Sequence, residues 1–170
     1  RFFPAGFYYK TFMQPRFAWK HIFEPVIRSA AGLGKAPKHR DADRYEYFYF
    51  HADVVVVGGG IAGLQAALVA GQSGARVLLM EQTADFGGRA VVDGVTIDGK
   101  AAEDWVAETL AALDAMDNVT IRSRMMGAGV YDHGFALGYE RLTDHAPEMA
   151  GPRHRLWRIR AGRIVTATGA

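Results

Sequence analysis

The chain has 170 residues, of which 49% are hydrophobic and 22% are charged, and its formal net charge is +2. This composition is typical of a globular protein with a core of its own and excludes a disordered chain. The sequence has no cysteine, which excludes disulfides and thiolate metal sites and is compatible with the cytoplasm, the location we expect. No apolar run approaches the ~20 residues that span a bilayer.

The N-terminal region differs in composition from the rest, and we expect residues 1–51 to form an aromatic-rich arm and linker. Most of the aromatic residues of the chain lie in it. Residues 16–31 are predicted to form one or two helical turns on either side of Pro25, ending at Gly32 and Gly34. Residues 35–44 have the composition of a linker, and 45–51 form an aromatic extended segment. So many aromatic side chains must pack on protein: this chain, a further domain or another subunit.

The next segment predicts a nucleotide-binding turn. Four valines, Val54 to Val57, are typical of a strand buried in a parallel sheet. Gly58, Gly60 and Gly63 follow in the G-x-G-x-x-G spacing. In this spacing the first glycine allows the tight turn, the second admits a pyrophosphate to the backbone, and the third lets the helix pack on the strand.

A helix over about residues 61–72 should follow this turn, with the amides of Ile61 and Ala62 at its positive end facing the pyrophosphate. A second strand over 77–80 ends at Glu81, where a carboxylate can accept the ribose hydroxyls of an adenosine. Its negative charge favours FAD or NAD over NADP, which has a 2′-phosphate. Arg76, just before the strand, is either a counterweight to that charge or a solvated cation.

The loop after the second strand is also predicted to approach the nucleotide. Gly87 and Gly88 allow a close turn, and Arg89 can donate two hydrogen bonds to a phosphate. A helix over 101–116 and a short third parallel strand over 119–121 come next.

Strands over 129–132, 135–142 and 155–160 are then predicted to form an antiparallel meander with a tight turn at Asp132–Gly134. A second turn is expected at 161–162, followed by a strand over 163–167. The closing Ala-Thr-Gly-Ala places Thr168 and Gly169 where small residues let backbone approach a ligand.

These elements predict an α/β fold: a Rossmann-like parallel sheet with an inserted three-stranded antiparallel meander, and an FAD/NAD(P)-binding domain over 52–170. Because the chain lacks an initial Met and stops directly after a strand, we expect it to be incomplete at both ends. No residue pattern indicates a catalytic residue or a metal site. Runs of basic residues in 1–44 and 153–163 favour an interface or a solvated face over nucleic acid, since no nucleic-acid motif accompanies them.

The order of the motifs (GGGIAG, an acid-ended strand, GGR, a meander, then ATGA) resembles the two-dinucleotide-binding flavoproteins. Within them the chain is similar to the α subunits of heterotetrameric sarcosine oxidases. The similarity includes the segments 1–13, 24–34, 130–134, 139–145 and 155–160. It implies that the nucleotide contacts are Gly58, Gly60, Gly63, Glu81, Gly88, Arg89, Thr168 and Gly169.

The resemblance implies that the complex demethylates sarcosine to glycine, with oxygen and tetrahydrofolate as acceptors and the chemistry mainly on a partner flavin subunit. NAD is then expected in this chain, and FAD and FMN in the complex. The partners would be a β (flavin) subunit, smaller subunits and an amine substrate, with no nucleic acid and no membrane. Two alternatives remain open: an FAD-binding subunit of a related amine or opine oxidoreductase, and a non-catalytic assembly subunit whose dinucleotide is structural.

Overall fold

The computed structural model describes residues 14–32, 34, 37–146 and 148–169, and it divides the chain into two units, residues 1–42 and 43–170. The aromatic residues expected at positions 2–12 of the arm lie outside the described residues. The segment 45–51 belongs to the second unit, because it forms the first half of a long strand, β1 (Tyr45–Val57).

The described part of the first unit is helical. A short α-helix α2 (Arg16–Ala18), a π-helix η1 (Trp19–Phe23) and an α-helix α3 (Glu24–Ala30) follow one another without a break. Helical structure on both sides of Pro25 was predicted and is present, as one continuous run. Pro25 lies in the first turn of α3, directly after the π-helix.

The second unit contains a mixed six-stranded sheet in the order β5-β2-β1-β8-β7-β6. Its strands are β1, β2 (Val77–Met80), β5 (Val119–Arg122), β6 (Met125–Tyr131), β7 (Phe135–Arg141) and β8 (His154–Thr166). β1, β2, β5 and β8 pair in parallel, while β6, β7 and the first half of β8 pair antiparallel. The predicted Rossmann-like parallel sheet with an antiparallel addition is confirmed.

The helices of this unit are α4 (Ile61–Gln72), α5 (Arg89–Val92) and α6 (Ala102–Asp114). A 3-10 turn, η2 (Asp132–Gly134), joins β6 to β7 at the predicted hairpin position. A small hairpin of β3 (Thr96–Ile97) and β4 (Lys100–Ala101), which was not predicted, lies between α5 and α6.

The turn expected at residues 161–162 is wrong, because β8 runs through this point as a single strand. Its first half pairs antiparallel with β7, and its whole length pairs in parallel with β1, from Tyr45↔His154 to Val57↔Thr166. Gly162 allows this path, since a Cβ there would lie 2.9 Å from the Asp53 carbonyl oxygen. The glycine therefore serves a close approach of two strands.

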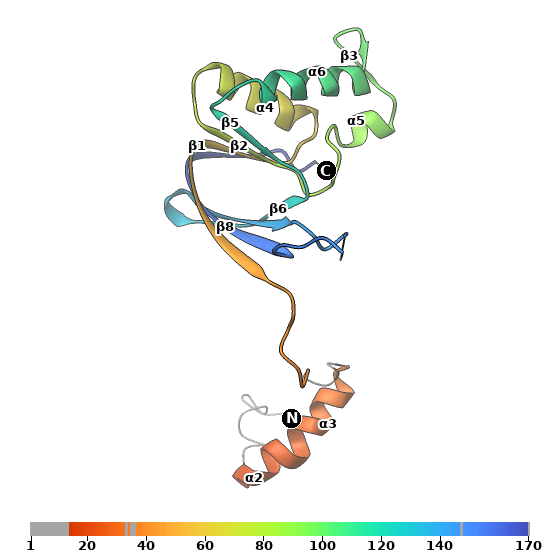
Figure 1. The fold of residues 1–170 in the computed structure, drawn as a ribbon, viewed down its shortest axis with the longest axis vertical. Coiled ribbons are helices and arrows are strands. Elements are labelled where there is room, and N and C mark those ends of the chain that lie inside the picture. The colour runs from red at the N-terminus through yellow and green to blue at the C-terminus, as the bar shows by residue number, and fades with distance from the viewer. Residues whose placement is uncertain (1–13, 33, 35–36, 147, 170) are drawn as a thin grey trace, which may run out of the picture. The chain divides into compact units, whose positions relative to one another are not determined.

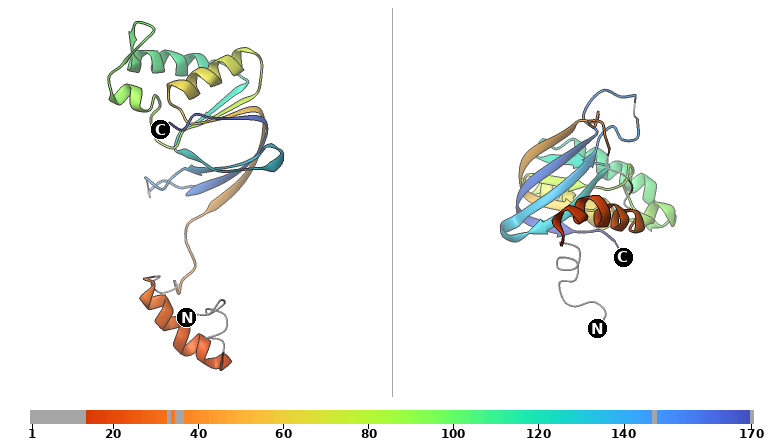
Figure 2. Two further views of the ribbon diagram at one scale, coloured as in Figure 1. Left: turned by 180° about the vertical axis from the view of Figure 1, so that it is seen from behind. Right: turned by 90° about the horizontal axis from the view of Figure 1, so that it is seen from below.

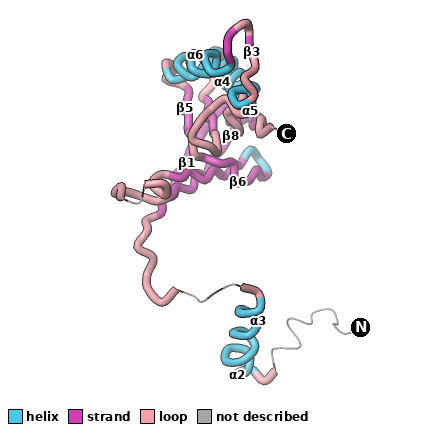
Figure 3. The backbone as a smooth tube through the Cα atoms, turned by 90° about the vertical axis from the view of Figure 1, so that its right-hand side faces the viewer, coloured by secondary structure: helices cyan, strands magenta, loops and turns pink. Residues whose placement is uncertain are grey.

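Two hydrophobic cores hold the unit together. One lies between the parallel strands and helices α4 and α6, and includes Val56, Leu64, Leu79 and Leu113. The other lies where the sheet coils over itself, between the parallel strands and β6, β7 and β8, and is centred on Trp157. The result is a layer of helices, a parallel layer and an antiparallel layer (Figures 1 and 3).

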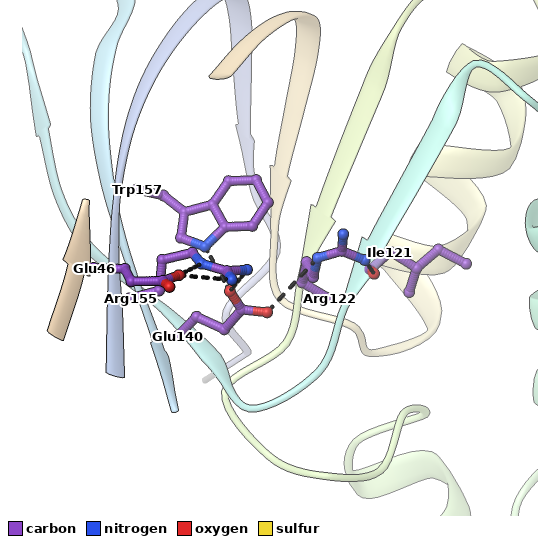
Figure 4. A network of polar contacts seen from close by, with 6 residues as sticks. All are labelled: Glu46, Ile121, Arg122, Glu140, Arg155 and Trp157. Carbon is purple, nitrogen blue, oxygen red and sulfur yellow. Dashed lines mark hydrogen bonds and ion pairs between the residues drawn. The ribbon is translucent and has the colours of Figure 1, made fainter. Parts of the chain in front are cut away.

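A polar network crosses the second core (Figure 4). The buried Glu140 carboxylate accepts hydrogen bonds from Trp157 Nε1 at 2.7 Å and from Arg155 Nη1 at 3.3 Å. Arg155 also donates to Glu46, and Arg122 Nε lies 3.6 Å from Glu140. The network therefore connects β1, β5, β7 and β8.

No helix among the described residues is long and apolar enough to cross a membrane.

Candidate dinucleotide-binding site

The glycine-rich turn between β1 and α4 contains two positions where the backbone conformation or the packing of the fold requires glycine. Gly58 has a φ of +108°, and a Cβ there would lie 2.3 Å from the Ala167 carbonyl oxygen. A Cβ on Gly63 would lie 1.9 Å from the Gly58 carbonyl oxygen. The turn and the close packing of α4 on β1 thus have the geometry predicted for these two positions.

Gly60 is different. Its φ of −71° suits any residue, and a Cβ there would meet no atom within 4 Å. Among the glycines of the described ranges, Gly60 alone combines a negative φ with open space around the added Cβ. Neither backbone conformation nor packing therefore accounts for glycine at this position. A ligand group resting on bare backbone does account for it.

Gly60 is also the N-cap of α4, and having no side chain it cannot cap the first amides of the helix. Ile61, Ala62 and Gly63 form the first turn of this 12-residue helix. Its amides and the positive end of its dipole are suited to an anion, in the manner of a pyrophosphate.

The Glu81 side chain ends the second strand and is turned toward the glycine-rich turn. Its Oε2 accepts a hydrogen bond from the Gly59 amide at 2.7 Å, and its Oε1 accepts from the Thr83 amide at 2.8 Å. The Thr83 hydroxyl lies 2.9 Å from the same Oε1. Each carboxylate oxygen can accept two hydrogen bonds, so the free capacity for a ribose hydroxyl is concentrated at Oε2.

The Gly87–Gly88 loop lies directly against the glycine-rich turn. The Gly87 amide donates to the Gly59 carbonyl at 2.8 Å, and Gly60 and Gly87 form an isolated parallel bridge. A Cβ on Gly88 would lie 3.5 Å from Gly60 Cα, and one on Gly59 would lie 2.4 Å from the Phe86 ring. The predicted approach of this loop to the turn is thus present.

The closing ATGA segment reaches the same place from β8. The Ala167 amide donates to the Val57 carbonyl at 2.8 Å, and Ala167 packs beside Gly58 and Gly63. Thr168 and Gly169 continue past this contact and are exposed. Gly169 has a φ of +83°, in the region that favours glycine. Three segments distant in sequence therefore converge on the turn.

Arg89 begins α5 at the edge of this arrangement. Its guanidinium is paired with Asp93, with Nη2 3.1 Å from Oδ1 and Nε 3.3 Å from Oδ2, and 85% of its side chain is exposed. To contact a phosphate, Arg89 would have to leave this surface pair. Arg76 lies at the opposite end of β2 from Glu81 and pairs with Asp53, so it is no counterweight to Glu81.

Sequence reasoning missed Thr83 and Phe86. Thr83 follows the strand-ending acid by two residues, a spacing at which its amide and hydroxyl can return to the carboxylate. Phe86 fills the space beside Gly59. Among the described residues, no group of three His, Cys, Asp or Glu side chains could hold a metal ion.

This fold and the convergence of its loops define a dinucleotide-binding α/β domain. Residues 53–143 match the FAD dependent oxidoreductase family, and the chain belongs to this family.

Curated relatives support the resemblance that the motifs indicated. The chain is 48% identical, over 99% of its length, to sarcosine oxidase subunit alpha of Rhizobium meliloti (strain 1021). It is 42% identical, over 82% of its length, to the subunit of the same name from Corynebacterium sp. (strain P-1). It spans only 17% and 15% of the length of these two relatives. The predicted similarity to sarcosine oxidase α subunits is therefore confirmed for this part of them.

Solved structures agree with the fold. L-proline dehydrogenase from P. horikoshii has a TM-score of 0.57 and 27% identity, covering 80% of this chain and 26% of that one. A geranylgeranyl bacteriochlorophyll reductase-like protein from Thermoplasma acidophilum has a TM-score of 0.51 and 14% identity, covering 71% of this chain and 40% of that one. The second likeness supports the fold alone.

Proposed function

We propose that this chain is the dinucleotide-binding part of the α subunit of a sarcosine-oxidase-type complex, and that the loops around Gly60 hold NAD. The complex would oxidise sarcosine to glycine with oxygen and tetrahydrofolate as acceptors, on a partner flavin subunit. A cytoplasmic location and assembly with β and smaller subunits are parts of the same proposal.

The observation that supports nucleotide binding most directly is the environment of Gly60. The backbone there tolerates any residue and the space beside it is open, yet the residue is glycine. The same position lies at the N-terminus of α4, and the amide of the neighbouring Gly59 bonds to Glu81, an acid 22 positions further along the chain from Gly59. An ADP moiety fits all three features, because its pyrophosphate needs bare backbone and amides, and its ribose needs an acceptor.

In this proposal the residues of the chain bind and orient the nucleotide. The first amides of α4 and the exposed Gly88 backbone contact the pyrophosphate, and Arg89 pairs with a phosphate. Glu81 accepts from the ribose, and Thr168 and Gly169 approach the nucleotide from β8. A nicotinamide or flavin ring, when bound, supplies the hydride-transfer chemistry. In our proposal no described side chain of this cradle acts as an acid or a base.

FAD in the same cradle is the second candidate. The family to which the chain belongs is FAD dependent, and NAD and FAD share the ADP moiety that these loops would contact. The chain would then be the FAD-binding subunit of a related amine or opine oxidoreductase. A subunit with a purely structural dinucleotide is a third reading, in which removal of the nucleotide lowers stability and leaves turnover of the complex intact.

The experiment that separates these readings is mass spectrometry of the nucleotide released when the full-length protein containing this chain is denatured. Release of NAD is the result we expect. Release of FAD would select the second candidate, and release of no nucleotide from the wild type would contradict the cradle. A Gly60→Val variant should release none, whereas Val69→Ile, an exposed change on the same helix, should release as much as the wild type.

A further inference from the structure

The antiparallel layer has an outer face that no α-helix of residues 43–170 covers (Figures 1 and 2). Alternate residues of a strand share a face, and residues paired between neighbouring strands share it too. The pairs Tyr47↔Leu156, Leu156↔Tyr139 and Arg158↔Leu137 therefore lie on one face of the sheet. We define the outer face by ten residues of β1, β7 and β8: Tyr45, Tyr47, Tyr49, His51, Phe135, Leu137, Tyr139, Leu156, Arg158 and Arg160.

Large aromatic side chains of this face are open to solvent. Tyr47 is 66% exposed and Tyr49 is 64% exposed, and both lie on β1, at one side of the face. Contiguous exposed aromatic surface of this kind marks interaction sites on proteins.

Two arginines lie over aromatic rings of this face. The Arg158 guanidinium carbon is 5.0 Å from the centre of the Tyr47 ring and 5.3 Å from that of Tyr49, and Arg158 also donates to the Tyr49 hydroxyl. The Arg160 guanidinium carbon is 5.0 Å from the centre of the Phe135 ring. A guanidinium held over an aromatic ring keeps further N–H donors for another partner.

The positive charge of this face is uncompensated. In the arginine-rich segment 153–163, Arg153 pairs with Asp43, and Arg155 pairs with Glu46 and Glu140 on the opposite face of the sheet. Within the described part of the chain, neither Arg158 nor Arg160 forms an ion pair. The basic run of the sequence is thus divided between an internal network and an exposed face.

We propose that the outer face binds an acidic segment of a different polypeptide chain, whose carboxylates pair with Arg158 and Arg160. A guanidinium can pair with a carboxylate through two parallel hydrogen bonds, and tyrosine and arginine are among the residue types that contribute most to binding energy at interfaces. A second copy of this chain would bring like charges together. Nucleic-acid bases would compete with Arg158 for the faces of the tyrosine rings that they need for stacking.

Zero-length crosslinking tests this contact in the full-length protein purified together with the chains that assemble with it. The R158K variant introduces an amine that a carbodiimide joins to a touching carboxylate. We expect a crosslink from position 158 to an Asp or Glu of another polypeptide, identified by mass spectrometry. R163K is the matched control, because Arg163 is exposed on the same strand and, among the residues that the structure describes, bonds only to the Gly162 carbonyl. It should give no such crosslink.

Charge reversal gives an independent measure. R158E combined with R160E should weaken association with the partner chain at least about tenfold at low salt, and added salt should reduce the difference. The released nucleotide should stay the same, because the cradle lies elsewhere; a failure of the nucleotide proposal is therefore distinguishable from a failure of this one. A crosslink to a second copy or to the chain itself, tight binding of a single-stranded RNA probe, or unchanged assembly of the double variant would each overturn the proposal.

Discussion

The Gly59 amide donates a hydrogen bond of 2.7 Å to Glu81 Oε2, which joins the glycine-rich turn after β1 to the acid that ends β2. Glu81 is 8% exposed, and its other oxygen accepts from Thr83. One carboxylate therefore shapes the turn and, in the proposed complex, also faces the ribose. Binding and local stability should fail together when it is removed.

Glu81→Ala should weaken dinucleotide binding by about 1–3 kcal/mol, the cost of losing a charge-assisted hydrogen bond and leaving a buried donor unpaired. The same change should lower the melting temperature, because the Gly59 amide loses its acceptor. Titration calorimetry and thermal unfolding of the full-length protein measure the two effects. Glu103→Gln, on the exposed first turn of α6, is the control. Unchanged affinity in Glu81→Ala would contradict the ribose assignment.

Gly60 and Gly63 should separate binding from folding. Gly60→Val places its side chain in open space, so it should lose nucleotide and cost no more than about 1 kcal/mol of stability, the order of an N-cap effect. Gly63→Ala places a Cβ 1.9 Å from the Gly58 carbonyl oxygen, so it should destabilise the fold by at least about 2 kcal/mol. Unfolding curves with and without nucleotide distinguish the two. A Gly60→Val protein that still retains nucleotide would refute the cradle.

The ion pair between Arg89 and Asp93 predicts that removal of Asp93 increases the affinity for the dinucleotide. If Arg89 contacts a phosphate, it must first leave Asp93, and an exposed ion pair of this kind is worth about 0–1 kcal/mol. Asp93→Asn should therefore tighten dinucleotide binding by up to about fivefold, and the gain should vanish when Arg89→Ala is added. Glu108→Gln breaks the surface pair with Lys100 and serves as control. A loss of affinity in Asp93→Asn would argue that Arg89 acts in its present position.

The pH dependence of stability should show the pair of Asp53 and Arg76. The hydrogen bond from Arg76 lowers the pKa of Asp53 to about 2. Because the unfolded carboxyl has an ordinary pKa of about 3.9, the pair stabilises the folded state above that pH, and its contribution disappears as pH falls toward 2. The difference in melting temperature between wild type and Asp53→Asn should be constant above pH ~5 and shrink below pH ~4.

The control for this comparison is Asp98→Asn, which removes an exposed charge that has no ion pair among the described residues. Its difference from wild type should not change in the same pH window. If Asp53→Asn behaves like this control, the ion pair has no effect on stability.

The sequence predicted the parallel part of the fold closely, since its signals are local. The helix expected at about 61–72 is α4, Ile61–Gln72, and the strand expected at 77–80 is β2, Val77–Met80. A glycine turn, a run of β-branched residues and helical periodicity are all visible without tertiary contacts.

The error in β8 has a tertiary cause, whereas the missed hairpin is local. Ala161–Gly162 has the composition of a turn, but Gly162 allows β8 to pass close to the Asp53 carbonyl of β1, a neighbour over a hundred residues earlier. The β3–β4 hairpin was missed although Asp98–Gly99 supplies its turn, with φ values of 50° and 78°. The hydrogen bond between Glu81 and the Gly59 amide likewise depends on strand pairing, which a single sequence does not specify. The bond between Glu81 and Thr83 is local.

The network around Glu140 predicts how the antiparallel layer is held to the parallel one. Glu140→Ala removes the acceptor of Trp157 Nε1 and a partner of Arg155, and should cost about 2–3 kcal/mol, less than a fully buried pair because Arg155 keeps Glu46. Glu140→Gln retains an acceptor oxygen for Trp157 and should cost about 1 kcal/mol. Glu46→Gln, at a half-exposed carboxylate, should cost less than either.

Denaturant unfolding followed by tryptophan fluorescence measures all three variants, and the emission of the folded state should change in Glu140→Ala alone. Equal losses in Glu140→Ala and Glu46→Gln would show that the indole hydrogen bond adds nothing and that the layers are held by the apolar contacts of Trp157 with its neighbours. The expected gradation, with the largest loss in Glu140→Ala, would identify the buried carboxylate as a polar link between the antiparallel layer and the parallel sheet that β8 joins.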